Sequence, residues 1–526
     1  MDREAQIDAA LAAGDVAGAV ALSRAALAAG SPDPFACNLV AWADIEAGRA
    51  AEGEALARRG LALAPDDPGL LTTLGLALRR QSRLREALAA YDAAIALAPD
   101  YAVAWLERGF ALHQGNSLQL AAQSYGRAAA LDPGQAPAFA GMAAIASTQG
   151  EGGEARRFAS EALARDPRDA VAHCAIARAD VADGAEDAAV ARLEALLSAP
   201  GLNIDNRSAA LSLLGDALAK TGEPQRAHDA WAAAKASLPD RFPQMAAAEP
   251  LVDMVARIDA AVLTGPDRFA VPGAAPERRH AFLLGYPRSG TTLVETILAT
   301  APGVVTLEEL PTLLAAETYF YLLADGPAAL GSMDAATADS LRTAYWQRVS
   351  DFGVAPEARL FVDMDPLKTM DLPLIGRLFP AATVIVMRRD PRDVLLSCFR
   401  QNFAASPIAF EFASLARAAR HYDALMRLQR HSLARMANPV FELRYEELVA
   451  DFDGVTRRLC TALGLEWSEA LRDFGATARQ RNVSTASVGQ VRRGLYNGGG
   501  QWQRFAAQLA PVLPVLQPWL DEFGYA

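Results

Sequence analysis

The sequence is poor in the residues that build disulfide frameworks and metal sites. Its 526 residues include four cysteines, which lie far apart and form no CxxC pair, and this argues against a disulfide scaffold or a zinc site. The six histidines show no HxH or HExxH spacing, so a protein-held metal has no support. We therefore expect free thiols, a reducing cytoplasmic location and no bound metal.

Long apolar runs and an excess of basic residues are also missing. No apolar stretch approaches the roughly 18 residues that a membrane helix needs, and the acidic start MDREAQ is unlike a secretory signal. Lys and Arg total 50 against 62 Asp and Glu, whereas a protein that neutralises nucleic-acid phosphates carries a basic domain. We expect neither a membrane span nor a nucleic-acid partner.

What the sequence does contain is a repeat in its first half. Prolines close successive segments at a period of 34 residues, at Pro65, Pro99, Pro133 and Pro167. Half a period away, turn-forming residues share this interval: Gly14, Gly48, Ser82, Asn116, Gly150 and Gly184. Two helices that meet at small residues, joined by a tight turn and ended by proline, explain the spacing.

This pattern resembles the tetratricopeptide repeat. The resemblance implies an all-α solenoid over residues 1–245 with about seven helix pairs. The last pair fits only after a four-residue insertion, because Gly222 lies 38 residues beyond Gly184. Such arrays leave a concave groove. The resemblance favours a protein or peptide in that groove over an array that only braces its neighbour.

The pattern changes after residue 245. Residues 246–279 are punctuated by prolines and contain one helical segment, Leu251–Leu263, which is typical of a linker. Over residues 280–526, short apolar runs alternate with helical patterns. This alternation predicts an α/β domain with a central parallel sheet.

A first anion-binding loop follows the strand predicted at Ala281–Leu284. The loop GYPRSGTT spans Gly285–Thr292, and a helix is expected over Leu293–Thr300. Its glycines let backbone N–H groups curl around an anion, and the helix N-terminus adds partial positive charge. Nucleotide hydrolases have Lys where Thr291 stands, and the fixed charge is Arg288 instead. A P-loop nucleotide hydrolase or kinase is therefore disfavoured.

A second strand–loop–helix unit begins at Thr383–Met387. The loop RRDPR spans Arg388–Arg392, Asp393 begins a helix, and Ser397 lies about one turn along it. Two arginines at the carboxyl end of a buried strand, with Ser397 nearby, suit a second phosphate clamp. Alone, such a string is better explained as a solvated turn, but two anion-binding loops in one sheet favour the clamp.

Together the two motifs resemble the sulfotransferase family, over roughly residues 275–526. The family uses 3′-phosphoadenosine 5′-phosphosulfate, and the fused repeats bring the chain near bacterial repeat-containing sulfotransferases and, more distantly, protein-tyrosine sulfotransferases. The resemblance implies that Arg288 contacts the phosphosulfate and that Arg389 and Ser397 hold the 3′-phosphate. The loop residues implied as the phosphosulfate cradle are Pro287, Ser289, Gly290, Thr291 and Thr292. The residues implied to lie in segments that close over the donor are Tyr445, Ser487 and Arg492.

The resemblance also implies a catalytic base, Glu309, next to Glu308. Sulfuryl transfer is an in-line displacement in which positioning and charge stabilisation dominate, and the acceptor hydroxyl must lose a proton to a base such as a partly buried carboxylate. Without the family match, the two glutamates read better as a solvated helix start. Arg288 is available to neutralise charge on the leaving group.

One position departs from the family. Met364 stands where a lysine is expected to stabilise the leaving group, and Lys368 follows four residues later. The resemblance leads us to expect a sulfotransferase that acts on an acceptor hydroxyl, which leaves a peptide tyrosine, a carbohydrate and a small molecule open as acceptors. The alternative is a repeat adaptor whose nucleotide-binding domain is weakly active or inactive.

Overall fold

The computed structural model describes residues 3–269, 279–323, 326–354, 359–480, 495 and 498–525. The chain forms two compact units, Met1–Leu202 and Asn203–Ala526. Within the described ranges, no helix has the length and apolar character required to traverse a bilayer.

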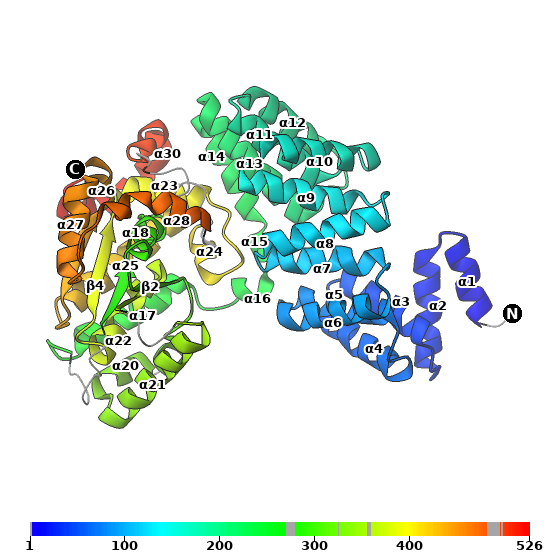
Figure 1. Cartoon of the computed structure of the whole chain (residues 1–526), viewed down its shortest axis with the longest axis horizontal. Helices are drawn as coiled ribbons and strands as arrows, with labels where there is room; N and C mark the ends of the chain where they lie inside the picture. The colour runs from blue at the N-terminus through cyan, green and yellow to red at the C-terminus, as the bar shows by residue number, and fades with distance from the viewer. Residues whose placement is uncertain are drawn as a thin grey trace. The chain divides into compact units, whose positions relative to one another are not determined.

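The first unit consists of helix pairs (Figure 1). Its helices are α1 (Arg3–Ala12), α2 (Val16–Ala28), α3 (Pro34–Glu46), α4 (Ala50–Leu63), α5 (Pro68–Arg80), α6 (Leu84–Leu97), α7 (Ala102–Gln114), α8 (Leu118–Leu131), α9 (Ala136–Gln149), α10 (Gly152–Arg165), α11 (Ala170–Ala182) and α12 (Glu186–Ser198). The turn residue within each pair has a positive φ at the position that the period predicts, including Ser82 at 61° and Asn116 at 56°. The solenoid is therefore confirmed.

Small residues let the two helices of a pair approach closely. A Cβ placed on Gly75 would stand 2.5 Å from the Tyr91 ring, and one on Gly109 would stand 2.6 Å from the Tyr125 ring. Both tyrosines are fully buried. Each ring therefore fills a notch left by a glycine on the partner helix, and the two contacts lie one 34-residue period apart in the sequence.

The second unit begins with helices that lead into the sheet domain. They are α13 (Ile204–Thr221), α14 (Pro224–Ala236), α15 (Leu238–Arg241), α16 (Pro243–Ala246) and α17 (Leu251–Thr264). The predicted boundary near residue 245 stays a prediction. The structure divides the chain earlier, between Leu202 and Asn203, and so places α13 and α14 with the sheet domain.

The described part of the sheet domain contains five strands, β1 (His280–Leu284), β2 (Val304–Glu308), β3 (Leu360–Met364), β4 (Thr383–Arg388) and β5 (Val440–Arg444). Its helices are α18 (Thr291–Ala299), α19 (Leu314–Phe320), α20 (Gly326–Ala329), α21 (Ala335–Asp351), α22 (Leu372–Leu378), α23 (Pro391–Arg400), α24 (Pro407–Glu411), α25 (Leu415–Leu433), α26 (Tyr445–Ala450), α27 (Phe452–Ala462), α28 (Phe474–Gln480), α30 (Ala506–Leu509) and α31 (Leu513–Glu522). Short 3₁₀ segments are η1 (Leu330–Ser332), η2 (Pro366–Asp371), η3 (Glu469–Asp473), η4 (Gln501–Phe505) and η5 (Ala510–Val512).

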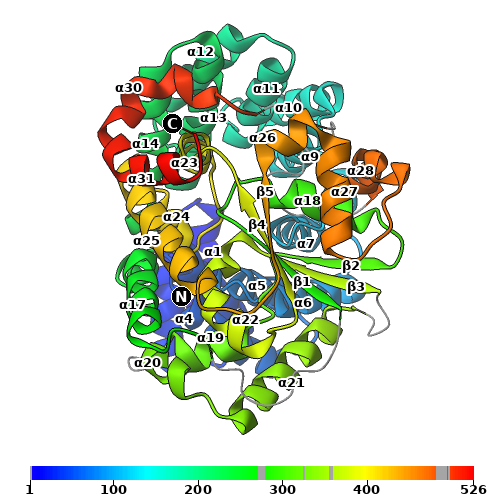
Figure 2. The same cartoon turned by 90° about the vertical axis from the view of Figure 1, so that its left-hand side faces the viewer.

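All strand pairs in the sheet are parallel, in the order β2-β3-β1-β4-β5. Figure 2 shows α18, α27 and α28 on one side of the strands and α17, α22 and α25 on the other. Every residue of β1 is buried between these layers, and all but His280 are apolar, as expected for a parallel sheet covered on both faces. Because the carboxyl ends of parallel strands meet at one edge, the loops after β1 and β4 become neighbours.

Candidate active site

The loop after β1 is held in place by contacts on both sides. The Gly285 N–H donates to Thr369 Oγ1 at 3.1 Å, and the Thr369 hydroxyl donates to the Gly285 carbonyl at 2.6 Å. Gly290 caps α18 with a φ of 106°, and a Cβ there would stand 2.8 Å from Cδ2 of Tyr445. Glycine fits both the left-handed backbone and the close approach, so α18 can begin at Thr291 with its N-terminus at the loop.

The two predicted anion-binding loops meet. Nε of Arg288 donates to Ser397 Oγ at 3.0 Å, and a guanidinium N–H of Arg389 donates to the Arg288 carbonyl at 2.9 Å. The Cys398 thiol donates to the Pro287 carbonyl at 3.3 Å. The loops after β1 and β4 therefore form one continuous surface at the edge of the sheet.

This surface is positively charged and has unsatisfied polar atoms. Burial lowers the pKa of the Arg288 guanidinium, which nevertheless stays charged as arginine does in proteins. The Arg389 guanidinium lies 4.7 Å from the centre of the Tyr445 ring. Ser289 Oγ and Arg389 Nε are buried without a hydrogen-bond partner among the described residues. Buried polar atoms are normally paired, so the loops fit an anion that brings its own acceptor oxygens.

Glu309 follows directly after β2. Its backbone N–H donates to the Met364 carbonyl at 2.7 Å, and its φ is 50°. The Glu309 side chain keeps access to solvent. The protein around it, together with the Asp365 and Glu308 carboxylates, nevertheless raises its pKa to about 7. The carboxyl is thus reachable from solvent but too enclosed to be ionised as easily as an ordinary glutamate.

Glu309 therefore lies beside β3, at the same edge of the sheet as the two loops. A carboxyl whose pKa is near neutral can take up a proton during a reaction. The alternative interpretation of Glu308 and Glu309 as a helix start is wrong, because Glu308 ends a strand.

Met364 and Lys368 occupy different environments. Met364 is fully buried in β3, where it pairs with Leu283 and Glu308. The buried Lys368 ammonium donates to Asp363 Oδ1 at 2.5 Å and to the Leu310 carbonyl at 2.9 Å. Lys368 is thus engaged in an internal ion pair, and it supports the loop that carries Glu309.

Comparison with protein families agrees with this geometry. Residues 281–469 match the model of the sulfotransferase family, and residues 75–116 match a model of the tetratricopeptide repeat. The chain joins tetratricopeptide repeats to a sulfotransferase-family domain. The matched range begins at β1 and contains both anion-binding loops, Glu309 and Tyr445.

A curated relative from Aquifex aeolicus (strain VF5), itself an uncharacterized protein, is 31% identical over 255 residues. The match covers 46% of this chain and 33% of that protein, so the chain spans about a third of its relative's length. Among solved structures, a tetratricopeptide repeat protein from Parabacteroides merdae is similar with a TM-score of 0.36 and 17% identity, covering 44% of this chain and 91% of that one. PilF of Pseudomonas aeruginosa gives a TM-score of 0.33 and 15% identity, with 40% and 92% covered.

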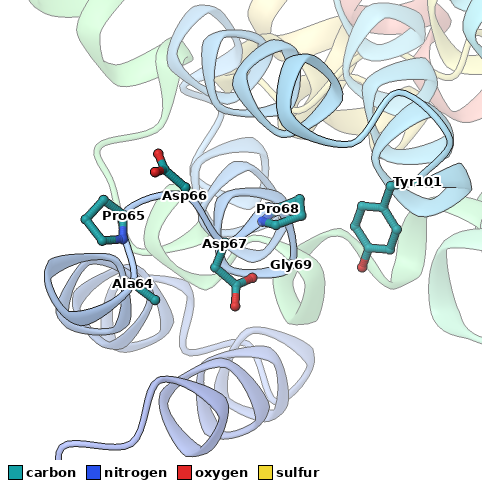
Figure 3. Close-up of a pocket in the computed structure, with 7 residues that line it drawn as sticks. All are labelled: Ala64, Pro65, Asp66, Asp67, Pro68, Gly69 and Tyr101. Carbon is teal, nitrogen blue, oxygen red and sulfur yellow. The ribbon is translucent and has the colours of Figure 1, made fainter.

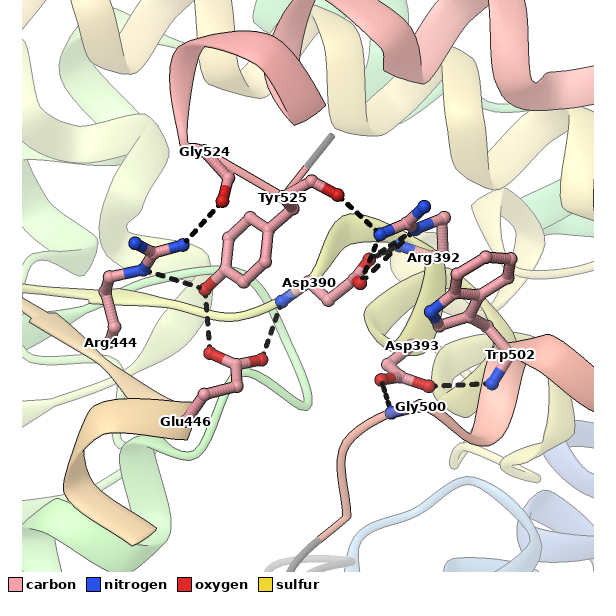
Figure 4. A network of polar contacts seen from close by, with 9 residues as sticks. All are labelled: Asp390, Arg392, Asp393, Arg444, Glu446, Gly500, Trp502, Gly524 and Tyr525. Atoms are coloured by element: carbon pink, nitrogen blue, oxygen red, sulfur yellow. Dashed lines mark hydrogen bonds and ion pairs between the residues drawn. The ribbon is translucent and has the colours of Figure 1, made fainter. Parts of the chain in front are cut away.

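A network of polar contacts ties the sulfotransferase domain's second loop to residues 500–502 (Figure 4). The Asp393 carboxylate accepts the backbone N–H groups of Gly500 and Trp502 at 2.7 and 2.8 Å. The Arg392 guanidinium lies 3.9 Å from the centre of the Trp502 ring and pairs with Asp390 at 2.7 Å. The helix that the sequence starts at Asp393 begins two residues earlier, with Asp390 as its N-cap.

Sequence reasoning missed the contacts that brace this loop from the other side. Glu446 accepts the Asp390 N–H at 3.1 Å and the Tyr525 hydroxyl at 2.8 Å, and Arg392 donates to the Tyr525 carbonyl at 2.7 Å (Figure 4). These residues lie far apart in the sequence and share no motif spacing. The one available signal was the acid of RYEEL, which directly follows Tyr445.

Two predicted donor-site residues, Ser487 and Arg492, lie outside the described residues. Within the described ranges, no group of three or more His, Cys, Asp or Glu side chains could hold a metal ion. A pocket of about 620 Å³ lies in the repeat unit, between Ala64–Gly69 and Tyr101 (Figure 3). None of its lining residues belongs to the anion-binding loops, so the chemistry and this pocket belong to different units.

Proposed function

We propose that the protein transfers the sulfuryl group of 3′-phosphoadenosine 5′-phosphosulfate to an acceptor hydroxyl. The observation that carries this proposal is the direct contact of two anion-binding loops, Arg288 with Ser397 and Arg389 with the Arg288 carbonyl. Two joined loops suit a ligand with an anionic group at each end, as this sulfonucleotide has. The sulfotransferase-family match over residues 281–469 supports the same chemistry.

Each loop would hold one end of the donor. The cradle of residues 287–292, with the N-terminus of α18, suits the phosphosulfate, because backbone N–H groups and the helix dipole stabilise negative charge there. Arg389 and Ser397 suit the 3′-phosphate, and the Arg389 Nε that lacks a partner among the described residues is available to it. Tyr445 stacks on Arg389 and keeps its guanidinium in place.

Glu309 would accept the proton of the acceptor hydroxyl. The acceptor oxygen forms its bond to sulfur while the bond from sulfur to the donor phosphate oxygen breaks, and the released charge is neutralised by Arg288. A base with a pKa of about 7 is matched to this task at neutral pH. The proton leaves the hydroxyl for the carboxylate, so the products are a sulfate ester and 3′-phosphoadenosine 5′-phosphate.

The test is incubation with sulfur-labelled donor and acceptors that include tyrosine peptides and carbohydrates. We expect release of 3′-phosphoadenosine 5′-phosphate together with a labelled acceptor. Arg389→Ala should weaken donor binding by about 10- to 100-fold, since hydrogen bonds of charged groups contribute about 1.5–3 kcal/mol. Arg430→Ala is the matched control, because Arg430 also lies over a ring, that of Trp519, and has an exposed ion pair.

The adaptor hypothesis keeps one supporting observation. Met364 cannot neutralise charge, and the Lys368 ammonium is engaged by Asp363. An adaptor would bind 3′-phosphoadenosine 5′-phosphate without turning over the donor. In either case we propose that the repeat groove binds a protein or peptide, which in the enzyme would include the acceptor.

A further inference from the structure

The helix pair α13–α14 is built like a repeat but belongs to the second compact unit. A Cβ on Gly215 would stand 2.4 Å from the Trp231 ring. The interval of 16 residues between them is the interval that joins Gly75 to Tyr91 and Gly109 to Tyr125. The two helices of this pair therefore pack as in the repeats, with an aromatic ring against a glycine, but the ring is that of a tryptophan and not of a tyrosine.

The tryptophan contacts the sulfotransferase domain. Trp231 is buried, and its ring centre lies 6.2 Å from that of Phe399 in α23 and 5.4 Å from that of Phe505 in η4. Figure 2 shows α14, α23 and α30 as neighbours. Ring contacts of this kind bury apolar surface between helices. The three elements α14, α23 and η4 therefore form a single packed cluster.

Polar contacts hold the same cluster of α14, α23 and η4 together. Lys235 of α14 is buried and donates to the Gln401 carbonyl, at the C-terminal end of α23, at 2.8 Å. A cation at that end of a helix is favourably placed. Arg400, 5.2 Å from the Trp231 ring centre, donates to Asp216 of α13 and to Gln501 Oε1, each at 3.2 Å. Arg400 thus links α13 to the segment at residues 498–502.

The same helix, α23, also carries the proposed donor contacts. Ser397 bonds to Arg288, and Asp393 holds the N–H groups of Gly500 and Trp502. A guanidinium N–H of Arg389 donates to the Gly498 carbonyl at 2.7 Å. Displacement of α23 or of residues 498–502 would therefore move Ser397 and Arg389 together.

We propose that Arg400 and Lys235 are positioning residues for the donor site, through which the last repeat-like helix pair sets the affinity for the sulfonucleotide. Neither residue touches the donor loops directly. They hold two segments: α23, which contains Asp393 and Ser397, and residues 498–502, to which Arg389 is bound. The proposal rests on the proposed function for the identity of the ligand.

The test compares Arg400→Ala and Lys235→Met with the full-length wild type, by calorimetric titration with 3′-phosphoadenosine 5′-phosphate. We expect the dissociation constant to rise by about 5- to 20-fold in each variant. The turnover number at saturating donor should stay within about twofold, because neither substitution replaces Glu309 or Arg288. Arg400→Lys, which keeps one of the two links, should recover part of the affinity.

Arg472→Ala is the matched control, because Arg472 also pairs with a carboxylate, Asp453, and lies 5.8 Å from the ring centre of a tryptophan, Trp467. Its donor affinity should equal that of the wild type. Hydrogen exchange of the Gly500 and Trp502 amides gives a readout without ligand, and it should speed up by about fivefold or more in Arg400→Ala only.

The outcomes separate the two proposals. Wild type that fails to bind 3′-phosphoadenosine 5′-phosphate sinks the proposed function, while the exchange experiment still decides whether Arg400 holds residues 498–502. Unchanged affinity and unchanged exchange in Arg400→Ala overturn the positioning role. If Lys235→Met does not fold, the partly exposed Arg400 decides alone.

Discussion

Left-handed backbone serves different ends in the repeat unit and in the sulfotransferase domain. Among the described residues other than glycine, it occurs at Ser82 and Asn116 in repeat turns and at Arg288 and Glu309 in the candidate site. Four other repeat turns use glycine at the equivalent position. Asparagine adopts this conformation with little strain, whereas a long side chain is disfavoured by about 1–2 kcal/mol.

The residue types found at positive φ indicate which constraint acts on each region, the geometry of a turn or the chemistry of a site. A repeat turn needs only the direction change, so glycine, serine and asparagine are interchangeable there. The sulfotransferase domain retains an arginine and a glutamate in strained positions, as functional sites often do. This comparison can be tested with pairs of variants that differ in either the backbone strain or the reactive side chain, but not in both.

The largest effect is expected at the proposed base. Glu309→Gln keeps the shape of the side chain but cannot accept a proton, so the turnover number should fall by about 10²- to 10⁴-fold. Donor affinity should change little, which titration with 3′-phosphoadenosine 5′-phosphate measures. Glu308→Gln, one residue earlier, is the control and should retain most activity; an equal loss of donor binding and turnover in Glu309→Gln would mean that the base is misassigned.

A glycine exchange compares the two regions directly. Gly14→Ala places Cβ in open space at a φ of 74°, and should lower the stability of the repeat unit by about 1–2 kcal/mol through backbone strain alone. Gly290→Ala adds a clash with Tyr445, which should lower stability by a further 1–3 kcal/mol or so. Calorimetric unfolding measures both. Equal losses at the two positions would show that the Tyr445 contact gives way freely.

The pH dependence of the reaction should be confined to the sulfotransferase domain. The pKa of Glu309 is raised to about 7 by burial and by nearby carboxylates, and the base works only when ionised. Turnover should therefore fall about tenfold per pH unit below 7 and level off above it, as a rate profile at saturating donor will reveal. Circular dichroism of the repeat helices should stay constant over the same range. A flat rate profile from pH 5.5 to 8 would exclude Glu309 as the group that controls the rate.

The repeat unit was predictable from sequence because its contacts recur at one period. Tyr91 and Tyr125 stand 34 residues apart and make the same contact with glycine. The irregular interval before Gly222 was the only trace of the last pair's different packing, and nothing in it identified Phe399 as the partner of Trp231. A repeat period predicts the contacts between neighbouring repeats, but it does not predict contacts between the repeats and the rest of the chain.

The candidate site was predictable in its parts but not in its assembly. The motifs located both anion-binding loops, and the strands β1 and β4 lie within a residue of their predicted bounds. The contact of Arg288 with Ser397, 109 residues away, depends on β1 and β4 being neighbours in the sheet. The links from Asp393 to Gly500 and from Glu446 to Tyr525 depend on tertiary packing that leaves no local pattern.

The smallest expected effect isolates the strain itself. Glu309→Gly removes both the side chain and the strained backbone, whereas Glu309→Ala removes the side chain and keeps the φ of 50°. Both variants should be inactive, and the glycine variant should be more stable by about 1 kcal/mol. Asn116→Gly, at a repeat turn with a φ of 56°, should change stability by only a few tenths of a kcal/mol and leave activity unchanged, since asparagine already tolerates this backbone. Urea unfolding of the three variants and the wild type measures the differences. A gain in Asn116→Gly as large as that in Glu309→Gly would mean that the two regions carry the same strain, and that the candidate site holds none beyond what an ordinary turn requires.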